Sequence, residues 1–286
     1  MPDGVRYSGV IESPRNERIR RYRRLLKRNF RHRERRFLAE GIQCVSEAIK
    51  HPSQPPECII CDERGMVSLG AYADIIERRE IPCFLARQQV LATLSTTVTP
   101  QGLLAVVHML DVDMESILES APSTLLVADR VRDPGNLGAM VRVADAAGTG
   151  GMIVCSESAD LYNPKTVRGT AGSIFHLPHC VGLGMREVAE ALKKRDYAVV
   201  AAHPRAGTEH WDFAWPHKTA LVLGNEAWGI LEEDKVLLDD MVRVPILGEA
   251  ESLNVAAAAA VLLYEAERAR RRAGQDGTEN GAGGRG

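Results

Sequence analysis

The sequence lacks the patterns that mark several common classes of protein. It has no Gly-x-Ser-x-Gly of the kind that carries the nucleophile of α/β hydrolases, and no strand is followed by the Gly-x-Gly-x-x-Gly or P-loop pattern of nucleotide-binding folds. No apolar run reaches the roughly 18 residues of a membrane span, and the arginines near the N-terminus lack the apolar stretch of a secretory signal. Hydrolase, dehydrogenase and membrane-spanning functions are therefore disfavoured, and we expect a cytoplasmic, globular protein.

A recognisable metal-binding pattern is also missing. Cys58-Ile-Ile-Cys61 has the spacing of a CxxC pair, but its centre is apolar and no second pair or HxxxH completes a zinc set. The histidines of the C-terminal half match no ligand spacing; they are His176, His179, His203, His210 and His217. We predict no metal, and reduced, mostly buried thiols at the six cysteines, which are Cys44, Cys58, Cys61, Cys83, Cys155 and Cys180.

Positive charge, by contrast, is concentrated in one short stretch. The formal net charge is -2, yet the residues from Arg15 to Arg36 include twelve Arg or Lys and only two Glu. Between Arg15 and Arg28, apolar residues recur at helical spacing and predict an amphipathic helix; they are Ile19, Tyr22, Leu25 and Leu26. Because so many like charges repel one another unless an anion neutralises them, we expect this helix to bind a nucleic-acid backbone. An anionic lipid surface and a merely solvated face remain as alternatives.

Length and pattern indicate two domains. The 286 residues, 45% of them hydrophobic, suffice for two ordinary cores. We expect a flexible lead-in at 1–14, a small α/β domain with the basic helix at 15–110, a linker at 111–122, a second domain at 123–272 and a disordered tail at 273–286. Within the first domain, the stretch FLAEGIQCVSEAI is expected to be a helix with a glycine inside it.

In the second domain, apolar runs alternate with helical stretches. The runs TLLVAD, GMIVC, YAVVAA, TALVLG and VRVPI are expected strands, which predicts an α/β fold whose parallel sheet is covered on both faces. Two runs end on Gly224-Asn225-Glu226 and Val244-Pro245-Ile246, and Ser252-Leu253-Asn254 then opens an alanine-rich helix. Since ligands of open α/β sheets bind beyond the carboxyl ends of the strands, we expect a small-molecule pocket at these three segments.

A stretch with two glycines follows the first strand of this domain. Gly135 and Gly138 permit close backbone approach, Asn136 can cap a helix, and Arg142 follows six residues after Asn136. Taken alone, the stretch is more typical of a capped helix with a surface arginine, because Gly-x-x-Gly is a weak sign of phosphate binding.

Three stretches taken together indicate a protein family far more specifically than any one of them does. DRVRDPGNLGAMVRVADAAG, LVLGNEAWGI and VPILGEAESLNVAAAAAVLLYE, in this order and at these separations, resemble the three motifs of the SpoU (TrmH) family of RNA ribose 2'-O-methyltransferases. The stretch RGTAGSIFHLP is similar to that family's sequence between the first and second motifs. FLAEGIQCVSEAI and TPQGLLAVV resemble its ribosomal-protein-like substrate-binding domain, so that the resemblance covers roughly residues 15 to 268.

The resemblance implies a fold that periodicity alone does not predict. The C-terminal parallel-sheet methyltransferase domain would contain a deep trefoil knot of the SPOUT type, beside a small N-terminal α/β RNA-binding domain. Without the resemblance an ordinary doubly wound sheet would be preferred, because knots are rare. The resemblance also implies a homodimer formed through the knotted domain, and S-adenosylmethionine as cofactor. The corresponding cofactor-binding positions are Leu223, Gly224, Asn225, Val244, Ile246 and Leu253.

For the reaction, the family's functional positions correspond to Asn136, Arg142, Glu226, Ser252 and Asn254. An arginine acting as general base, as proposed in the family, conflicts with a guanidinium that stays protonated in proteins. We expect Arg142 instead to hold the phosphate next to the target ribose and to stabilise the developing alkoxide. The side chains of Asn136, Glu226 and Asn254 would orient the ribose and the loop.

The basic helix and one further arginine are the expected RNA contacts; they are Arg18, Arg21, Arg24, Arg28 and Arg168. An accessory RNA-binding domain is more typical of the family's ribosomal RNA enzymes than of its short tRNA enzymes, which favours large-subunit (23S) rRNA as substrate. The alternatives are a tRNA ribose, an exposed base, and a non-catalytic RNA-binding protein of ribosome assembly. Housekeeping modification and resistance to a ribosome-targeting antibiotic both stay open.

Overall fold

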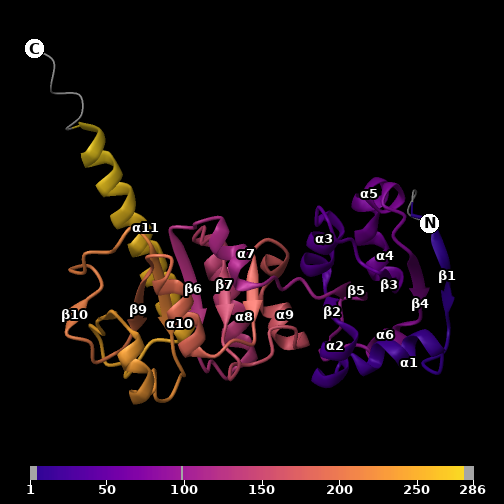
Figure 1. The fold of residues 1–286 in the computed structure, drawn as a ribbon. Coiled ribbons are helices and arrows are strands. Elements are labelled where there is room, and N and C mark those ends of the chain that lie inside the picture. The colour runs from indigo at the N-terminus through magenta and orange to yellow at the C-terminus, as the bar shows by residue number, and fades with distance from the viewer. Residues whose placement is uncertain (1–4, 98, 280–286) are drawn as a thin grey trace, which may run out of the picture. The chain divides into compact units, whose positions relative to one another are not determined.

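The computed structural model describes residues 5–97 and 99–279, with the backbone alone from 274 onward (Figure 1). Internal contacts divide the chain into two compact units. Unit 1 comprises Met1–Leu110 and Asp160–His176, and unit 2 comprises Asp111–Ala159 and Leu177–Gly286. Each unit has its own sheet, of five strands in unit 1 and of seven in unit 2, so the predicted α/β class is confirmed.

Unit 1 is built on a mixed sheet in the order β1-β4-β3-β5-β2. Strand β4 pairs in parallel with β1 and β3, whereas β5 pairs antiparallel with β3 and β2. The core contains Ile60, Leu104 and Val106 from the central strands. The strands are β1 (Tyr7–Ile11), β2 (Arg36–Glu40), β3 (Cys58–Cys61), β4 (Cys83–Ala86) and β5 (Leu103–His108). The helices are α1 (Glu17–Arg24), α2 (Arg28–Glu34), α3 (Ile42–Lys50), α4 (Glu63–Leu69), η1 (Gly70–Tyr72), α5 (Ala73–Arg78) and α6 (Gln88–Ala92).

Two segments of unit 1 differ from the sequence prediction. Strand β1 lies within the expected flexible lead-in and pairs with β4; residues 1–4 lie outside the described residues. The stretch FLAEGIQCVSEAI is not one helix, because its first four residues belong to β2 and pair with β5. Phe37 and Leu38 are both buried, which a strand achieves by placing successive side chains on opposite faces. Gly41 then separates β2 from α3 with a φ of 94°, a left-handed conformation that favours glycine.

The basic segment forms two helices where one was predicted. Asn16 caps α1 by accepting a hydrogen bond from the backbone N–H of Arg18 at 2.9 Å, and the chain turns after α1 before α2 begins. Ile19, Tyr22 and Leu25 are buried, so the apolar stripe of the predicted amphipathic helix is confirmed.

The segment Asp160–His176 lies within the range expected for the second domain, and its contacts group it with unit 1. The guanidinium of Arg31, which is 2% exposed, donates to the Asp160 carboxylate from Nη2 at 2.5 Å and from Nε at 3.1 Å. The rings of Phe37 and Tyr162 lie 4.9 Å apart. The segment contains α9 (Pro164–Gly169) and η2 (Ser173–Phe175).

Unit 2 is built on a seven-stranded sheet in the order β10-β12-β9-β11-β6-β7-β8. All of its strand pairs are parallel, as predicted. The strands are β6 (Thr124–Ala128), β7 (Met152–Val154), β8 (His179–Val181), β9 (Ala198–Ala202), β10 (Thr208–Glu209), β11 (Thr219–Leu223) and β12 (Asp240–Arg243). The helices are α7 (Met114–Glu119), α8 (Pro134–Ala146), α10 (Met185–Lys193), η3 (Glu232–Leu237) and α11 (Val255–Glu279).

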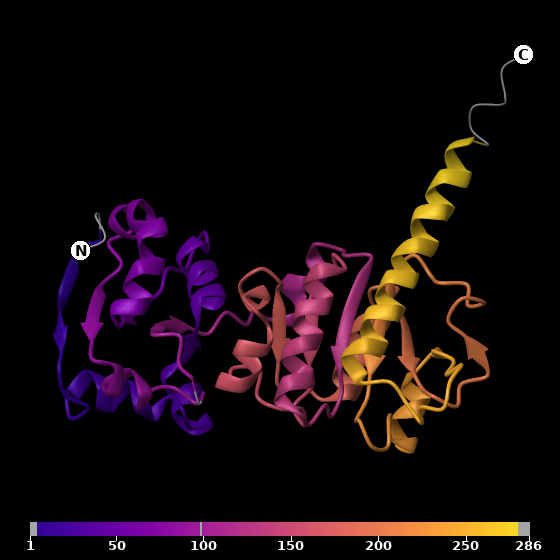
Figure 2. The ribbon, with the colours of Figure 1, turned by 180° about the vertical axis from the view of Figure 1, so that it is seen from behind.

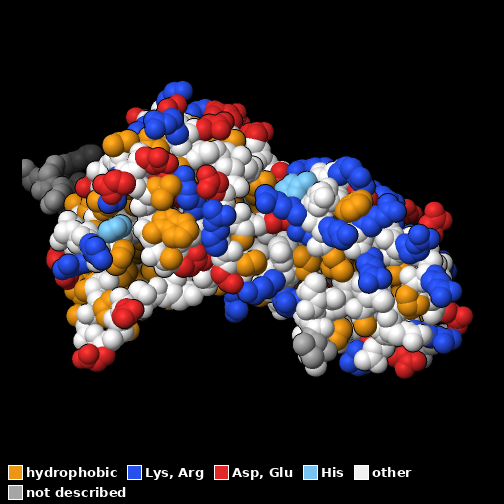
Figure 3. All heavy atoms as spheres, turned by 90° about the horizontal axis from the view of Figure 1, so that it is seen from below, with side chains coloured by type: hydrophobic (Ala, Val, Ile, Leu, Met, Phe, Trp, Pro, Cys, Tyr) orange, Lys and Arg blue, Asp and Glu red, His pale blue; other side chains and the backbone are white. Residues whose placement is uncertain are grey.

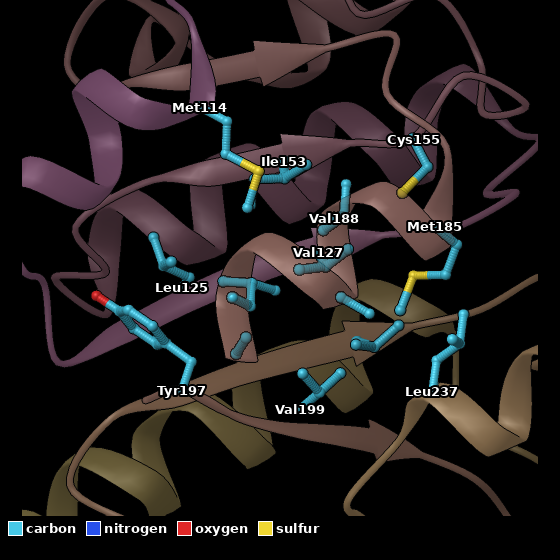
Figure 4. Packing of buried hydrophobic residues seen from close by; sticks show 14 of the residues in the cluster. Met114, Leu125, Val127, Ile153, Cys155, Met185, Val188, Tyr197, Val199 and Leu237 are labelled. Carbon is cyan, nitrogen blue, oxygen red and sulfur yellow. The ribbon is translucent and has the colours of Figure 1, made fainter. Parts of the chain in front are cut away.

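Helices cover both faces of this sheet. On one face, Met114 of α7 and Met185 and Val188 of α10 join a core with Val127 and Ile153 of the central strands (Figure 4). Burial of each such side chain contributes about 1.5–3 kcal/mol. On the other face, α8 and α11 pack against each other, as the view from behind shows (Figure 2).

Two expected segments of unit 2 have a different structure. The stretch 111–122 is not an open linker, since α7 lies within it and buries Met114, Ile117 and Leu118 in the core. Helix α11 continues to Glu279, so the stretch 273–279 is helical where disorder was expected; residues 280–286 lie outside the described residues. Within the described part of the chain, no helix is long and apolar enough to cross a membrane.

Candidate functional site

The candidate site lies in unit 2, beyond the carboxyl ends of the neighbouring strands β6 and β11. Three segments meet there: the N-terminus of α8, the turn that follows β11, and the start of α11. The first two are joined beneath the site by a backbone hydrogen bond from Asp129 N–H to the carbonyl of Leu223, at 2.9 Å. These are the segments that the three sequence motifs predicted.

Glu226 connects the turn after β11 to the N-terminus of α8. Its carboxylate accepts hydrogen bonds from the backbone N–H groups of Arg132 and Asp133, at 3.1 and 3.2 Å, and from Nδ2 of Asn136 at 3.0 Å. Partial burial by itself would raise the pKa of Glu226, but these hydrogen bonds outweigh it and hold the pKa below its ordinary value. Glu226 is therefore a carboxylate, an acceptor fixed at the start of a helix.

Asn254 brings the third segment to the same place. Its Nδ2 donates to Oδ1 of Asn136 at 2.7 Å, and its Oδ1 accepts the backbone N–H of Ala256 at 2.9 Å, which caps α11. Glu226, Asn136 and Asn254 thus form one chain of hydrogen bonds across three segments. Asp133, which the sequence analysis did not single out, caps α8 through the backbone N–H of Asn136 at 2.9 Å. The signal for it is Asp-Pro at the helix start.

The turn after β11 is held closed by its own hydrogen bonds. Asn225 and Gly229 exchange two backbone hydrogen bonds, of 3.0 and 2.9 Å, and Oδ1 of Asn225 accepts the N–H of Ala227 at 2.8 Å. A Cβ on Gly224 would lie 2.5 Å from the carbonyl group of Gly229, so only glycine fits where the turn closes on itself.

The other expected cofactor positions differ in exposure. The side chain of Leu223 is buried in the sheet, whereas Ile246 and Leu253 are 36% and 42% exposed on the chain between β12 and α11. Val244 is half-buried directly after β12. Leu253 directly precedes Asn254, so an exposed apolar side chain adjoins the hydrogen-bonded polar side chains, and the two together could contact a ligand of both characters.

Arg142 and Ser252 are exposed and do not join the chain of hydrogen bonds around Asn136. Arg142 lies six residues beyond Asn136 on α8, and within the described part of the protein its guanidinium makes no hydrogen bond or ion pair. The structure therefore brings together three of the five predicted catalytic residues.

The predicted RNA contacts of unit 1 lie on or beside a basic surface formed by α1 and α2 (Figure 3). Two of them are already paired with acids. Arg21 lies 3.3 Å from Glu34, and Arg168 lies 3.6 Å from Glu40. Arg18 stacks over a ring, with its guanidinium carbon 4.3 Å from the ring centre of Phe84.

Other basic side chains of this surface are exposed and have no acidic partner among the described residues; they are Arg20, Arg23, Lys27 and Arg28. A hollow of about 660 Å³ lies against α1, lined by arginines together with Tyr22 and Glu57. The sequence therefore located the basic surface correctly, and the structure separates its free cations from those engaged within the fold.

Comparison with known proteins identifies the family. The SpoU rRNA Methylase family profile matches residues 123–264, and an MRM3-like substrate binding domain profile matches residues 16–105. The chain is 35% identical over 257 residues to the Bacillus subtilis 23S rRNA (guanosine(2553)-2'-O)-methyltransferase RlmP, covering 89% of this chain and 97% of that protein. This chain belongs to the SpoU rRNA methylase family. The resemblance drawn from the three motifs is thereby confirmed.

Two further similarities extend the comparison. The 23S rRNA (uridine(2479)-2'-O)-methyltransferase of Streptomyces viridochromogenes is 32% identical over 262 residues, which cover 90% of this chain and 91% of that protein. The crystal structure of the SpoU methyltransferase AviRb from the same organism, in complex with AdoMet, superposes with a TM-score of 0.77 at 31% identity, covering 91% of this chain and 100% of that one. Among the described residues of this SpoU family member, no group of three or more His, Cys, Asp or Glu side chains is arranged to hold a metal ion.

Proposed function

We propose that this SpoU family protein transfers a methyl group from S-adenosylmethionine to the 2'-hydroxyl of a ribose in 23S rRNA. The observation that carries the proposal is the hydrogen-bonded chain of Glu226, Asn136 and Asn254, which joins all three family motifs at one point. The relatives named as 23S rRNA 2'-O-methyltransferases support both the reaction and the RNA. We place the reaction in the cytoplasm, because it requires ribosomal RNA.

For the cofactor site we propose Leu223, Gly224, Asn225, Val244, Ile246 and Leu253. Two observations fit S-adenosylmethionine. The turn at Gly224 closes tightly on Gly229, which fixes the backbone there, and the exposed side chains of Ile246 and Leu253 offer apolar contact. When bound, the cofactor supplies a methyl group on a positively charged sulfur. In-line attack by a ribose oxygen requires both reactants to be held in register, which is the part that protein residues contribute.

Arg142 is the proposed contact to the phosphate next to the target ribose. Its guanidinium is exposed and uncommitted, and it presents fixed donors that suit phosphate. Since a guanidinium stays charged, its role is to stabilise the developing alkoxide and not to accept the proton. Asn136, Glu226 and Asn254 would orient the ribose, and Ser252 would contact the substrate from the same loop.

For the wider RNA contact we propose the basic surface of unit 1. The free cations Arg20, Arg23, Lys27 and Arg28 are its main phosphate contacts, joined by Arg18 and Arg24. Arg21 and Arg168 have a smaller part, because their ion pairs with Glu34 and Glu40 already neutralise them. Such contacts hold the backbone around a target and carry little sequence identity.

We also propose that unit 2 contains the trefoil knot and forms a homodimer. Strand β12 lies beyond β9 from β11 in the sheet, yet α11, which follows it, packs against α8 and β11. This arrangement supports a chain path that returns past the turn after β11, which a knot would use. On α11, Val261 and Tyr264 are 38% and 54% exposed, and a second copy would cover them.

Resistance to a ribosome-targeting antibiotic is a finer proposal. It rests on the resemblance of the motifs to the avilamycin-resistance 23S rRNA methyltransferase of antibiotic-producing bacteria. The chain is 32% identical to the Streptomyces viridochromogenes enzyme, which is named for uridine 2479, and 35% identical to RlmP of Bacillus subtilis, which is named for guanosine 2553. Mapping the modified nucleotide decides between the two.

The test is transfer of labelled methyl from S-adenosylmethionine to purified 23S rRNA, to tRNA and to intact large subunits, followed by digestion to nucleosides. The proposal predicts label in a 2'-O-methyl nucleoside from 23S rRNA or from the subunit. Label in tRNA alone would move the substrate assignment to tRNA. Binding of both S-adenosylmethionine and RNA without transfer to any of the three would indicate an RNA-binding assembly protein.

A further inference from the structure

Arg130 has an unusual backbone conformation two residues after the end of β6. Its φ is +56°, in the left-handed region that favours glycine, so a side chain at this position has a conformational cost that its contacts must offset. Those contacts are extensive. Its Nη1 lies 2.6 Å from Oδ2 of Asp129 and 2.6 Å from Oδ2 of Asp234, and all three side chains are at most 12% exposed.

The backbone of the same residue makes a second connection. The carbonyl of Arg130 accepts a hydrogen bond from Nδ2 of Asn225 at 2.9 Å. Arg130 thus holds both ends of the segment 225–234: its carbonyl holds the turn at Asn225, and its guanidinium holds η3 at Asp234. Glu226, which orients Asn136, lies within that segment.

We propose that Arg130 is a positioning residue that fixes the segment 225–234 in the geometry that S-adenosylmethionine binding requires. The inference rests on the proposed function, because it assigns the turn after β11 to the cofactor. Arg130 lies in the first motif stretch, six residues before Asn136, and it acts through Asn225 and Asp234.

The contact of Arg130 with Asp129 and Asp234 requires the positive charge of the guanidinium. Two buried carboxylates share one guanidinium, and such groups repel each other unless a cation stands between them. Burial raises the pKa of Asp129, and Arg130 offsets part of that rise. Without the guanidinium, Asp234 would move away from Asp129 toward water, and η3 would move with it.

The test compares amide hydrogen–deuterium exchange across 225–234 in the wild type and in Asp234→Asn, without cofactor. This substitution removes one of the two buried carboxylates and leaves Arg130 paired with Asp129, so the fold survives. An asparagine oxygen can still accept from Arg130, but the bond loses its charge assistance, which should speed exchange at that end of the segment by about 10-fold. The affinity for S-adenosylmethionine should fall by about the same factor, while RNA affinity stays unchanged.

Two further variants sharpen the result. Glu157→Gln is the matched control, because Glu157 also contacts Arg130, at 3.4 Å, but lies outside the segment; its exchange and cofactor affinity should match the wild type. Arg130→Gly accepts the left-handed backbone and removes the guanidinium, so it should reproduce the Asp234→Asn effect more strongly. Unchanged exchange at 225–234 in both Asp234→Asn and Arg130→Gly would overturn the inference, and so would an increase spread evenly over unit 2.

The same design separates this inference from the proposed function. Exchange is measured without cofactor, so it reports on the role of Arg130 even in a protein that binds no S-adenosylmethionine. A wild type with no affinity for S-adenosylmethionine would instead overturn the cofactor assignment. Faster exchange in Asp234→Asn with unaltered cofactor affinity would show that Arg130 holds the segment for some other purpose, which also contradicts the inference.

Discussion

Asn254 and Asn136 lie 118 residues apart in the sequence and are joined by a 2.7 Å hydrogen bond. Each also has a structural role. Asn254 caps α11, and the backbone N–H of Asn136 donates to the side chain of Asp133, which caps α8. The bond connects the loop after β12 with the helix that carries Arg142. Motifs that are remote in sequence are thereby held in one geometry.

Asn254→Asp separates the two roles of Asn254. An aspartate caps a helix as well as asparagine does, but it cannot donate a hydrogen bond to Oδ1 of Asn136. We expect only a small loss of thermal stability, because the cap is kept and the lost hydrogen bond is exposed, and a fall in kcat of about 10- to 100-fold. Asn254→Ala, which also loses the cap, should in addition cost about 1 kcal/mol of unfolding free energy. Wild-type turnover in Asn254→Asp would contradict the orienting role.

The lowered pKa of Glu226 predicts how the stability of the fold changes at acidic pH. Its folded pKa is held below the ordinary value of 4.5, so the carboxylate stabilises the fold above about pH 4.5 and loses this effect as pH falls through the lower, folded pKa. The difference in unfolding free energy between the wild type and Glu226→Gln should be constant near neutral pH and shrink below about pH 4.5. Chemical denaturation at several pH values measures it. A difference independent of pH down to 3 would argue against the hydrogen-bonded carboxylate.

Arg142→Lys tests the phosphate contact. Lysine keeps the charge and loses the planar fork that binds phosphate through two parallel hydrogen bonds. We expect kcat/KM for RNA to fall by at least about 10-fold, with the affinity for S-adenosylmethionine unchanged. The matched control is Arg186→Lys on α10, where the side chain is also exposed. Near-normal turnover in Arg142→Lys would rule out the bidentate contact.

The free cations of unit 1 should matter more for RNA than the paired ones. The double variant Arg20→Ala/Arg23→Ala should lower RNA affinity and reduce the slope of log affinity against log salt by about 0.7–0.9 per lost phosphate contact. Arg21→Ala serves as the control, because that side chain pairs with Glu34. Fluorescence anisotropy with a labelled 23S fragment measures both quantities. Equal effects of Arg21→Ala and of each free arginine would show that the ion pair opens on binding.

Gly224→Ala should disrupt the cofactor turn. The added Cβ would meet the backbone of Gly229 at 2.5 Å, which cannot move without opening the turn. Calorimetry should show at least about 10-fold weaker binding of S-adenosylmethionine. Gly207→Ala is the matched control, since a Cβ there meets open space. Equal affinity in both variants would place the cofactor elsewhere.

Much of unit 2 could be predicted from the sequence, because its elements follow local periodicity. The buried run of β11 and the amphipathic spacing of Met185, Val188 and Leu192 in α10 determine their structures by themselves. The strands β8 and β10 were missed, since three and two residues are too few to show a period. The candidate catalytic residues were predicted from family resemblance. In the structure, three of them, Glu226, Asn136 and Asn254, are connected by hydrogen bonds.

Features that depend on distant pairing could not be predicted. The residues Phe37 to Glu40 have helix-compatible composition, and become a strand because β5 pairs with them and Gly41 ends the run. The contact of Arg130 with Asp234 spans 104 residues and belongs to no spacing pattern. The segment Asp160–His176 groups with unit 1, where Asp160 forms a buried ion pair with Arg31. From charge patterning alone, Arg31 would be expected on the surface.

The most direct test of the central claim asks which atom receives the methyl group. Labelled methyl is transferred to 23S rRNA, and the RNA is hydrolysed with alkali, which needs a free 2'-hydroxyl to cleave the neighbouring phosphodiester. Ribose 2'-O-methylation predicts that the label appears in an alkali-resistant dinucleotide. Label confined to mononucleotides would place the methyl on a base and contradict the proposed reaction.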